Sequence, residues 1–243
     1  MISRTSPWLT LGSAMLTPNV VLQILRDGND RFVSGASAGH DVHEALKITA
    51  EGQSPFAAVV SCIDSRVPVE TVFDLTIGHA FSARVAGNVV GPDVVGSLEF
   101  ACAVAGSRLV VILGHTGCGA VKGAVDGVEL GSLTGILDKI QPAVKAVTAT
   151  RKPAKSGKPS ADAGYVDAVA EANVRHTMAS LLEQSPVLKE LVAARTVGLV
   201  GAMYDVRTGV VSFLDADAPA HAGPARATAP QAASDAALAN GHA

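Results

Sequence analysis

The fold class is clearest in residues 108–114, which read Arg108-Leu-Val-Val-Ile-Leu-Gly114. A run of strand length that is apolar on both faces is typical of a buried strand in a parallel sheet. Three further runs of this kind lie at residues 56–61, 80–86 and 196–203. Helical patterns separate the runs, at residues 68–75, 93–105 and 133–191. This alternation predicts an α/β fold in which helices flank a mostly parallel central sheet.

The two ends of the folded region add a helix and a hairpin. Thr17 followed by Pro18 is typical of a helix start, and an apolar stripe continues to Gly35, which predicts an N-terminal helical arm. A turn at residues 207–209 predicts an antiparallel C-terminal edge hairpin. We expect one domain over residues 17–215, between a variable segment, 1–16, and an Ala-rich disordered tail, 216–243. Residues 152–164, rich in Lys, Pro, Ser and Gly, predict an exposed disordered loop between helices.

Composition excludes several classes of partner. The 243 residues carry 19 basic and 22 acidic side chains, a net charge of −3, so the chain has no basic field to attract nucleic acid or anionic lipid. Aromatic residues make up only 4%, which argues against a stacking platform for bases. The sequence has no apolar run long enough to span a membrane. Its first fifteen residues make a poor signal-peptide core, so we expect a cytoplasmic protein, with export by a trimmed or divergent signal as the alternative.

Polar side chains gather where two of the predicted strands end. The first strand runs into Cys62-Ile-Asp64-Ser-Arg66, and the strand at 108–114 runs into His115-Thr-Gly-Cys118. Ligands of open α/β sheets bind at the carboxyl ends of the strands, so we expect these side chains to share one site.

The donor set of this site suits a metal ion. Cys62, His115 and Cys118 offer two thiolates and one imidazole, which fit tetrahedral Zn²⁺. Three protein ligands leave a fourth position open, as in catalytic zinc sites. Zinc then lowers the pKa of bound water and supplies hydroxide near neutral pH. The constellation predicts hydration or hydrolysis of an electrophilic carbon by zinc-bound hydroxide.

Asp64 has two possible roles beside this metal. Paired with Arg66, its carboxylate stays ionised and is able to accept the proton of zinc-bound hydroxide. It is equally able to swing onto the metal as a fourth ligand and close the site.

Simpler interpretations of the same residues stay open. Buried free cysteines are often small apolar side chains, and Cys62 and Cys118 would alternatively pair as a disulfide or a redox dithiol. An Asp64–Arg66 pair by itself is commonly a solvated surface pair. We expect Cys102 to be a core residue. The other histidines show no ligand spacing and are predicted to lie on the surface: His40, His43, His79, His176, His221 and His242.

Together, Cys62-x-Asp64-x-Arg66 and His115-x-x-Cys118 closely resemble the β-class carbonic anhydrases. The resemblance continues in family order at residues 25–33, 84–88, 96–99, 114–120, 171–175 and 201–205, and covers about residues 17–215. It implies reversible hydration of CO₂ to bicarbonate and a proton. Carried over residue by residue, Cys62, His115 and Cys118 are ligands of one Zn²⁺ per chain, and Asp64 and Arg66 form the catalytic dyad.

The family has two regulatory types. In one, an Asp closes on zinc at lower pH, and a Trp, an Arg and a Tyr form a non-catalytic bicarbonate site. Here Val59 stands at the Trp position, while Arg84 and Tyr204 match the other two residues. In the open type, a Gln nine residues before the first cysteine donates a hydrogen bond to substrate, and Gln53 stands there. The resemblance therefore favours the open type.

The resemblance also implies a substrate cleft and a partner chain. Phe81, Ala86 and Phe100 correspond to cleft residues, Phe100 in place of a frequent Tyr. In the family the cleft lies at a dimer interface, so Gln53 and Phe81 are expected to serve the neighbouring subunit's zinc. The N-terminal helix resembles the arm that wraps the partner, which implies a homodimer or a dimer of dimers. Two rivals remain: a relative that hydrolyses CS₂ or COS, and a non-catalytic zinc or bicarbonate sensor that Asp64 caps permanently.

Overall fold

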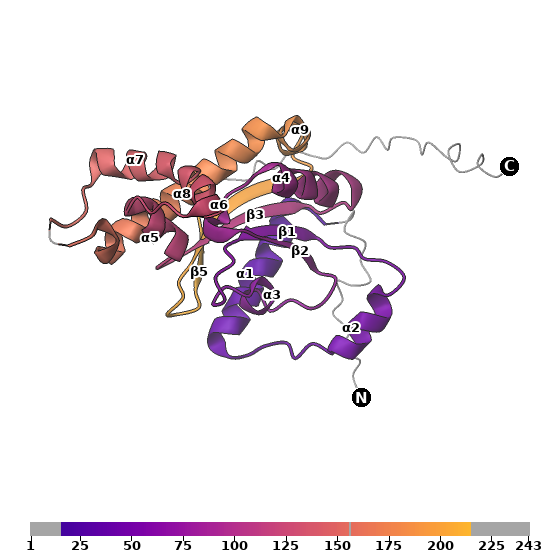
Figure 1. Ribbon diagram of the computed structural model, residues 1–243. Coiled ribbons are helices and arrows are strands. Elements are labelled where there is room, and N and C mark those ends of the chain that lie inside the picture. The colour runs from indigo at the N-terminus through magenta and orange to yellow at the C-terminus, as the bar shows by residue number, and fades with distance from the viewer. Residues whose placement is uncertain (1–15, 156, 215–243) are drawn as a thin grey trace.

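The computed structural model describes residues 16–155 and 157–214, and within them five strands form one sheet in the order β2-β1-β3-β4-β5 (Figure 1). The strands are β1 (Ala57–Ser61), β2 (Ala80–Arg84), β3 (Leu109–His115), β4 (Gly198–Tyr204) and β5 (Val211–Phe213). The first four are parallel, and β5 pairs antiparallel with β4 at the edge. The predicted α/β class, mostly parallel sheet and C-terminal hairpin are confirmed.

Both faces of the sheet are covered, because alternate side chains of a strand point to opposite faces. Val59 and Val111 face one core, which α1 (Pro18–Ser34) and α3 (Val69–Val72) complete. Val60 and Ile112 face the other. That second core is closed by three helices: α4 (Pro92–Glu99), α8 (Ala163–Gln184) and α9 (Pro186–Ala193). The two helical layers are seen on either side of the sheet in Figure 1.

The N-terminal helix begins and ends where its sequence predicts. Thr17 caps α1 by accepting a hydrogen bond from the Val20 N–H group, and Gly35 ends the helix at φ 70°. A second helix, α2 (Val42–Thr49), lies apart from the sheet and buries only Ala45 among its described residues (Figure 1).

The region between β1 and β3 is less helical than its pattern predicts. Residues 68–75 form only the single turn α3, because Asp74 takes a φ of 47° and leaves the helical conformation. The short 3₁₀ turn η2 (Ala86–Asn88) follows β2. Beyond α4 the chain continues as one π-helical turn, η3 (Phe100–Val104).

The long helical region predicted at 133–191 is divided. Its parts are α6 (Gly131–Asp138), α7 (Gln141–Thr150), the 3₁₀ turn η4 (Pro159–Ala161), α8 and α9, while α5 (Gly119–Val125) precedes it. Helices α5 to α7 and the first turns of α8 form a third core, which includes Cys62 and Cys118. The predicted loop at 152–164 is an exposed connection, but Ser160 ties it to Asp126 and α8 already begins at Ala163.

The domain limits at 16/17 and 215/216 fall at the edge of what the structure describes. The disordered state of the Ala-rich tail, with His221 and His242, therefore concerns residues outside the described ranges and stays a prediction. Over residues 16–155 and 157–214, we find no helix with the length and hydropathy that a membrane span requires.

Candidate metal centre

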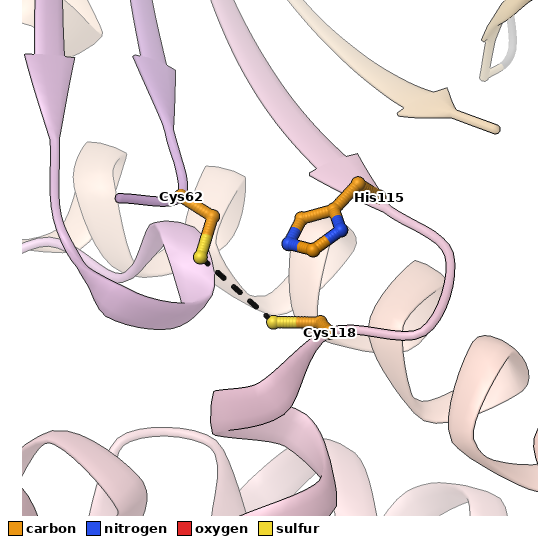
Figure 2. A group of neighbouring side chains, drawn as sticks. All are labelled: Cys62, His115 and Cys118. Carbon is orange, nitrogen blue, oxygen red and sulfur yellow. Dashed lines mark hydrogen bonds between the residues drawn. The ribbon is translucent and has the colours of Figure 1, made fainter. Parts of the chain in front are cut away.

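The sheet brings Cys62, His115 and Cys118 to one point at its carboxyl edge. Ser61, the last residue of β1, pairs in register with Leu113 of β3. Cys62 follows β1 directly, His115 ends β3, and Cys118 stands immediately before α5. Their ligand atoms all lie within 4.8 Å of one another, and Figure 2 shows the three side chains turned toward a common centre.

His115 presents one ring nitrogen to this centre. The residue is 1% exposed, and its Nδ1 lies 3.0 Å from the carbonyl oxygen of Thr116. Since a carbonyl only accepts, Nδ1 carries the proton and donates it, which leaves the lone pair of Nε2 free. Nε2 is buried without a hydrogen-bond partner in the described part of the chain. A buried nitrogen with no partner is costly unless a ligand such as a metal ion takes its lone pair.

The two thiols are placed for shared coordination. The Sγ atoms of Cys62 and Cys118 lie 3.9 Å apart, and neither residue forms a disulfide. Two thiolates each about 2.3 Å from a tetrahedral zinc ion would lie about 3.8 Å apart, so the spacing fits this ion. The hydrogen bond between the thiols lowers the pKa of Cys62 and raises the pKa of Cys118. A metal ion binds both sulfurs only as thiolates, so its binding here would release the remaining thiol proton.

Asp64 and Arg66 form a tight ion pair beside the donor set. Arg66 Nε donates to Asp64 Oδ1 at 2.9 Å, and Arg66 Nη2 donates to Oδ2 at 2.7 Å. These bonds from Arg66 hold the pKa of Asp64 well below its usual range. Asp64 Oδ2 lies 3.9 Å from His115 Nε2, so the carboxylate reaches the centre while its charge is fixed by Arg66.

Arg84 binds the backbone carbonyls of Cys62 and Asp64. Its Nε donates to the Cys62 carbonyl at 3.1 Å and its Nη2 to the Asp64 carbonyl at 2.6 Å. The resemblance associates Arg84 with an inhibitory anion site, whereas in this structure its guanidinium supports the Cys62–Asp64 segment.

Helix α8 contributes two polar contacts that sequence reasoning missed. Asp167 accepts a hydrogen bond from the Gly117 N–H group at 2.8 Å, between the two candidate ligands His115 and Cys118. Asn173, fully buried, donates to the Gly87 carbonyl at 2.8 Å. Asn173 had a detectable signal, because an amide on the apolar stripe of a helix needs a partner. Asp167 had none, since a half-exposed acid on a helix is ordinary.

Two of the four predicted substrate residues, Phe81 and Phe100, line a separate groove. Phe81 and Phe100 stand edge to face with ring centroids 6.1 Å apart, and they line a cavity of about 790 Å³. Cys62, His115 and Cys118 are not among the residues lining it. Gln53 is exposed ahead of β1, and Ala86 begins η2. Within one chain, Phe81 and Phe100 therefore meet each other away from the metal centre.

One prediction about the remaining histidines is wrong. His79 is 3% exposed, because it packs on Phe56 and its Nδ1 accepts a hydrogen bond from the Thr76 N–H group. Burial lowers the pKa of His79 to about 4, and the neighbouring His40 adds to this shift. Cys102 is buried as expected, and burial raises the pKa of its thiol to about 12.

Comparison with known sequences points to one family. The family described as carbonic anhydrase matches residues 57–211. Carbonic anhydrase 2 of Mycobacterium tuberculosis is 33% identical over 199 residues, which cover 79% of this chain and 90% of that protein. The carbonic anhydrase of Mycolicibacterium smegmatis is 32% identical over 81% of this chain and 93% of its own length.

Solved structures agree with this similarity. The β-carbonic anhydrase CafA of Aspergillus fumigatus superposes with a TM-score of 0.63 at 28% identity, over 84% of this chain and 93% of CafA. A tetrameric β-carbonic anhydrase of Sordaria macrospora superposes with a TM-score of 0.61 at 26% identity, over 81% of this chain and 98% of its own.

Proposed function

Because this chain belongs to the β-class carbonic anhydrase family and catalyses the reversible hydration of carbon dioxide, we propose that Cys62, His115 and Cys118 hold a zinc ion for that reaction. The observation that carries the proposal is the buried, unpartnered Nε2 of His115 facing two thiols. The similarity to named carbonic anhydrases favours CO₂ over CS₂ or COS, and an enzyme over a sensor.

The chain's own residues then organise the chemistry around the ion. A zinc ion bound there lowers the pKa of a water ligand, so that hydroxide is available near neutral pH. Asp64 accepts a hydrogen bond from the attacking oxygen and fixes the direction of its lone pair toward CO₂. Arg66 keeps Asp64 ionised through two side-chain hydrogen bonds, so that this acceptor does not take up the proton itself. The proton released by hydration passes to buffer.

The open resting state fits this arrangement better than the closed one. Both carboxylate oxygens of Asp64 already accept hydrogen bonds from Arg66, and Oδ1 also accepts one from the Arg66 N–H group at 3.0 Å. To bind the metal as a fourth ligand, Asp64 would have to give up part of this network. We therefore assign Asp64 to the dyad and leave the fourth position to water and substrate.

We further propose that the protein is a homodimer or a dimer of dimers whose substrate cleft is completed across the interface. Phe81 and Phe100 lie away from the metal centre of their own chain, and Phe100 is 51% exposed on a monomer. Gln53 and Phe81 would then bind CO₂ or bicarbonate at a partner's zinc, with Ala86 and Phe100 lining the same cleft. We also propose a cytoplasmic location, where the thiols of Cys62 and Cys118 stay reduced and able to bind zinc.

The decisive experiment is stopped-flow CO₂ hydration on metal-analysed protein between pH 6.5 and 9, with Cys118→Ser as the variant. We expect one zinc per wild-type chain and activity across this range. Cys118→Ser should lose both zinc and activity, because a hydroxyl is a poor zinc ligand compared with a thiolate. Full zinc content in Cys118→Ser would contradict the ligand assignment. Activity confined to pH above about 8 would contradict the open state.

A further inference from the structure

The buried amide of Asn173 is connected to the metal centre through one residue. Asn173 Nδ2 donates to the carbonyl oxygen of Gly87 at 2.8 Å. The N–H group of the same Gly87 donates to Cys62 Sγ at 3.3 Å. Asn173 is 0% exposed in the middle of α8, and 86 residues separate it from Gly87 in sequence. The two bonds fasten opposite sides of Gly87, one to the helix and one to the thiol.

The turn that carries Gly87 needs this support. Gly87 has a φ of 69° and the next residue, Asn88, a φ of 47°, so two consecutive residues are left-handed. Such a conformation is strained at a non-glycine residue and persists only where its surroundings impose it. A Cβ atom on Gly87 would lie 2.7 Å from Ile140 Cδ1, so the turn is also closely packed. A small rotation about the φ or ψ of Gly87 would turn its N–H group away from Cys62.

Packing alone does not explain an asparagine at position 173. Its Oδ1 is buried with no hydrogen-bond partner among the residues described here. An unpaired buried amide oxygen is destabilising, a cost that a leucine of similar size would avoid. The neighbouring Val169, Ala170 and Val174 on α8 are all apolar and buried. The function of the amide therefore lies in the bond that it does make, to Gly87.

We propose that Asn173 is a positioning residue for the metal ligand Cys62, acting through the backbone of Gly87. This inference rests on the proposed zinc site. Asn173 holds the Gly87 carbonyl, which fixes the backbone torsions of Gly87; these torsions direct the Gly87 N–H group at the sulfur and hold the sulfur in the orientation that coordination requires. Partners of metal ligands typically contribute a factor of 10–100 in metal affinity. Asn173 is one step further from the metal, and its effect passes through a backbone group rather than a side chain.

The test measures metal affinity on folded, full-length apoprotein. Zinc affinity is determined by competition with a chelator, and cobalt is added in parallel to record the thiolate-to-cobalt absorption band. Asn173→Leu removes the amide while keeping the side-chain volume. Leu181→Ala is the matched control, because Leu181 is a buried core residue on the same helix and its loss destabilises without touching Gly87. If Asn173→Leu does not fold, Asn173→Ser replaces it, since a hydroxyl at this position is too short to reach the carbonyl.

We expect the Asn173 variant to bind zinc roughly 10–100-fold more weakly than wild type, with a shifted or weakened cobalt band. Leu181→Ala should show wild-type affinity and spectrum despite its lower stability. If the Asn173 variant binds zinc within twofold of wild type while Cys118→Ser abolishes binding, this inference is overturned and the proposed function stands. An equal loss in Leu181→Ala would overturn it as well, by showing a general effect of stability. Wild-type apoprotein that binds no zinc would overturn both the proposed function and this inference.

Discussion

At the scale of single residues, both the charge and the orientation of the Asp64 carboxylate are fixed. Arg66 fixes both of its oxygens while Oδ2 stays 3.9 Å from the free nitrogen of His115. Asp64→Asn keeps the shape but replaces one acceptor oxygen with a donor. We expect normal zinc content and a fall in the rate of CO₂ hydration of about 10²–10⁴-fold.

Metal analysis and stopped-flow kinetics on the same sample check this expectation. Glu171→Gln is the matched control, because Glu171 is an acid with a 47% exposed side chain that pairs with Arg175 on the surface of α8. The control should turn over like wild type. Wild-type rates in Asp64→Asn would remove Asp64 from the mechanism.

The positions of the candidate ligands could be predicted from sequence because each follows a recognisable strand. Cys62 and His115 stand at the ends of apolar runs, and parallel strands bring such ends to one edge. The support from Asp167 and Asn173 could not be predicted in the same way. Their contacts depend on where α8 crosses the sheet, which the helical pattern of residues 163–184 does not specify. His79 was misplaced for a related reason, since its burial comes from Phe56, 23 positions earlier.

At the scale of elements, α1 packs so closely on the segment after α3 that one position has no room for a side chain. A Cβ atom on Gly28 would lie 2.0 Å from the carbonyl oxygen of Phe73, and a backbone atom cannot rotate away. We expect Gly28→Ala to lower the free energy of unfolding by about 1–3 kcal/mol, measured by urea denaturation.

Gly135→Ala provides the comparison within another helix. No described atom lies within 4 Å of a Cβ built at Gly135 of α6, so this substitution adds only helix propensity. It should raise the free energy of unfolding by about 0.5–1 kcal/mol. If the two variants changed stability in the same direction, the close approach of α1 would not limit position 28.

The strands could be predicted more reliably than the helices. Each apolar run became a strand within a few residues of its predicted ends, because burial on both faces leaves a continuous pattern. Within the region 133–191 the sequence predicts only the loop at 152–164, because the helices on either side of the other breaks share apolar spacing. Those other breaks lie where Pro142 and Pro186 begin new helices and where Ser185 caps α9 by accepting from the Leu188 N–H group. A proline or a capping serine identifies the start of a helix only once the end of the preceding helix is known.

At the scale of the whole molecule, stability depends on pH through buried His79. Above pH 6.5 its ring is neutral in both folded and unfolded chains, so its titration does not change the free energy of unfolding. As pH falls from 6.5 toward 4, the unfolded chain takes up a proton that the folded chain refuses, because burial lowers the pKa of His79 to about 4. The protonation of this residue should lower the free energy of unfolding by about 2 kcal/mol at pH 5 and by about 3 kcal/mol below pH 4.

The measurement compares wild type with His79→Asn in urea at pH 7.5 and pH 5. The asparagine can still accept the hydrogen bond from the Thr76 N–H group but does not titrate. Effects of groups that do not interact with His79 are common to both proteins and cancel. The variant should therefore show a smaller loss of stability on acidification, by about 2 kcal/mol. Equal losses would contradict the assignment.

The proposed shared cleft predicts complementation between two inactive chains. Cys118→Ser retains Gln53 but lacks zinc, and Gln53→Leu retains zinc but lacks the proposed substrate contact. If Gln53 serves the partner's zinc, a mixed dimer assembles one complete site, so co-refolding the two variants should restore CO₂ hydration above either variant alone. If Gln53 serves its own zinc, every site in the mixture is incomplete and no activity is gained. Tagging the two variants differently and purifying over both tags in turn confirms that mixed dimers have formed.

The order of strands in the sheet also determines when each strand can be paired during translation. β1, β2 and β3 leave the ribosome together, but β4, which covers the other edge of β3, begins 83 positions after the end of β3. At roughly 5–20 residues per second, that edge waits about 4–16 s for its neighbour. During this interval β3 offers unpaired backbone groups, and the apolar face that α8 later covers is open to water. Chaperone demand and aggregation of nascent chains should therefore peak while residues 116–197 are being translated.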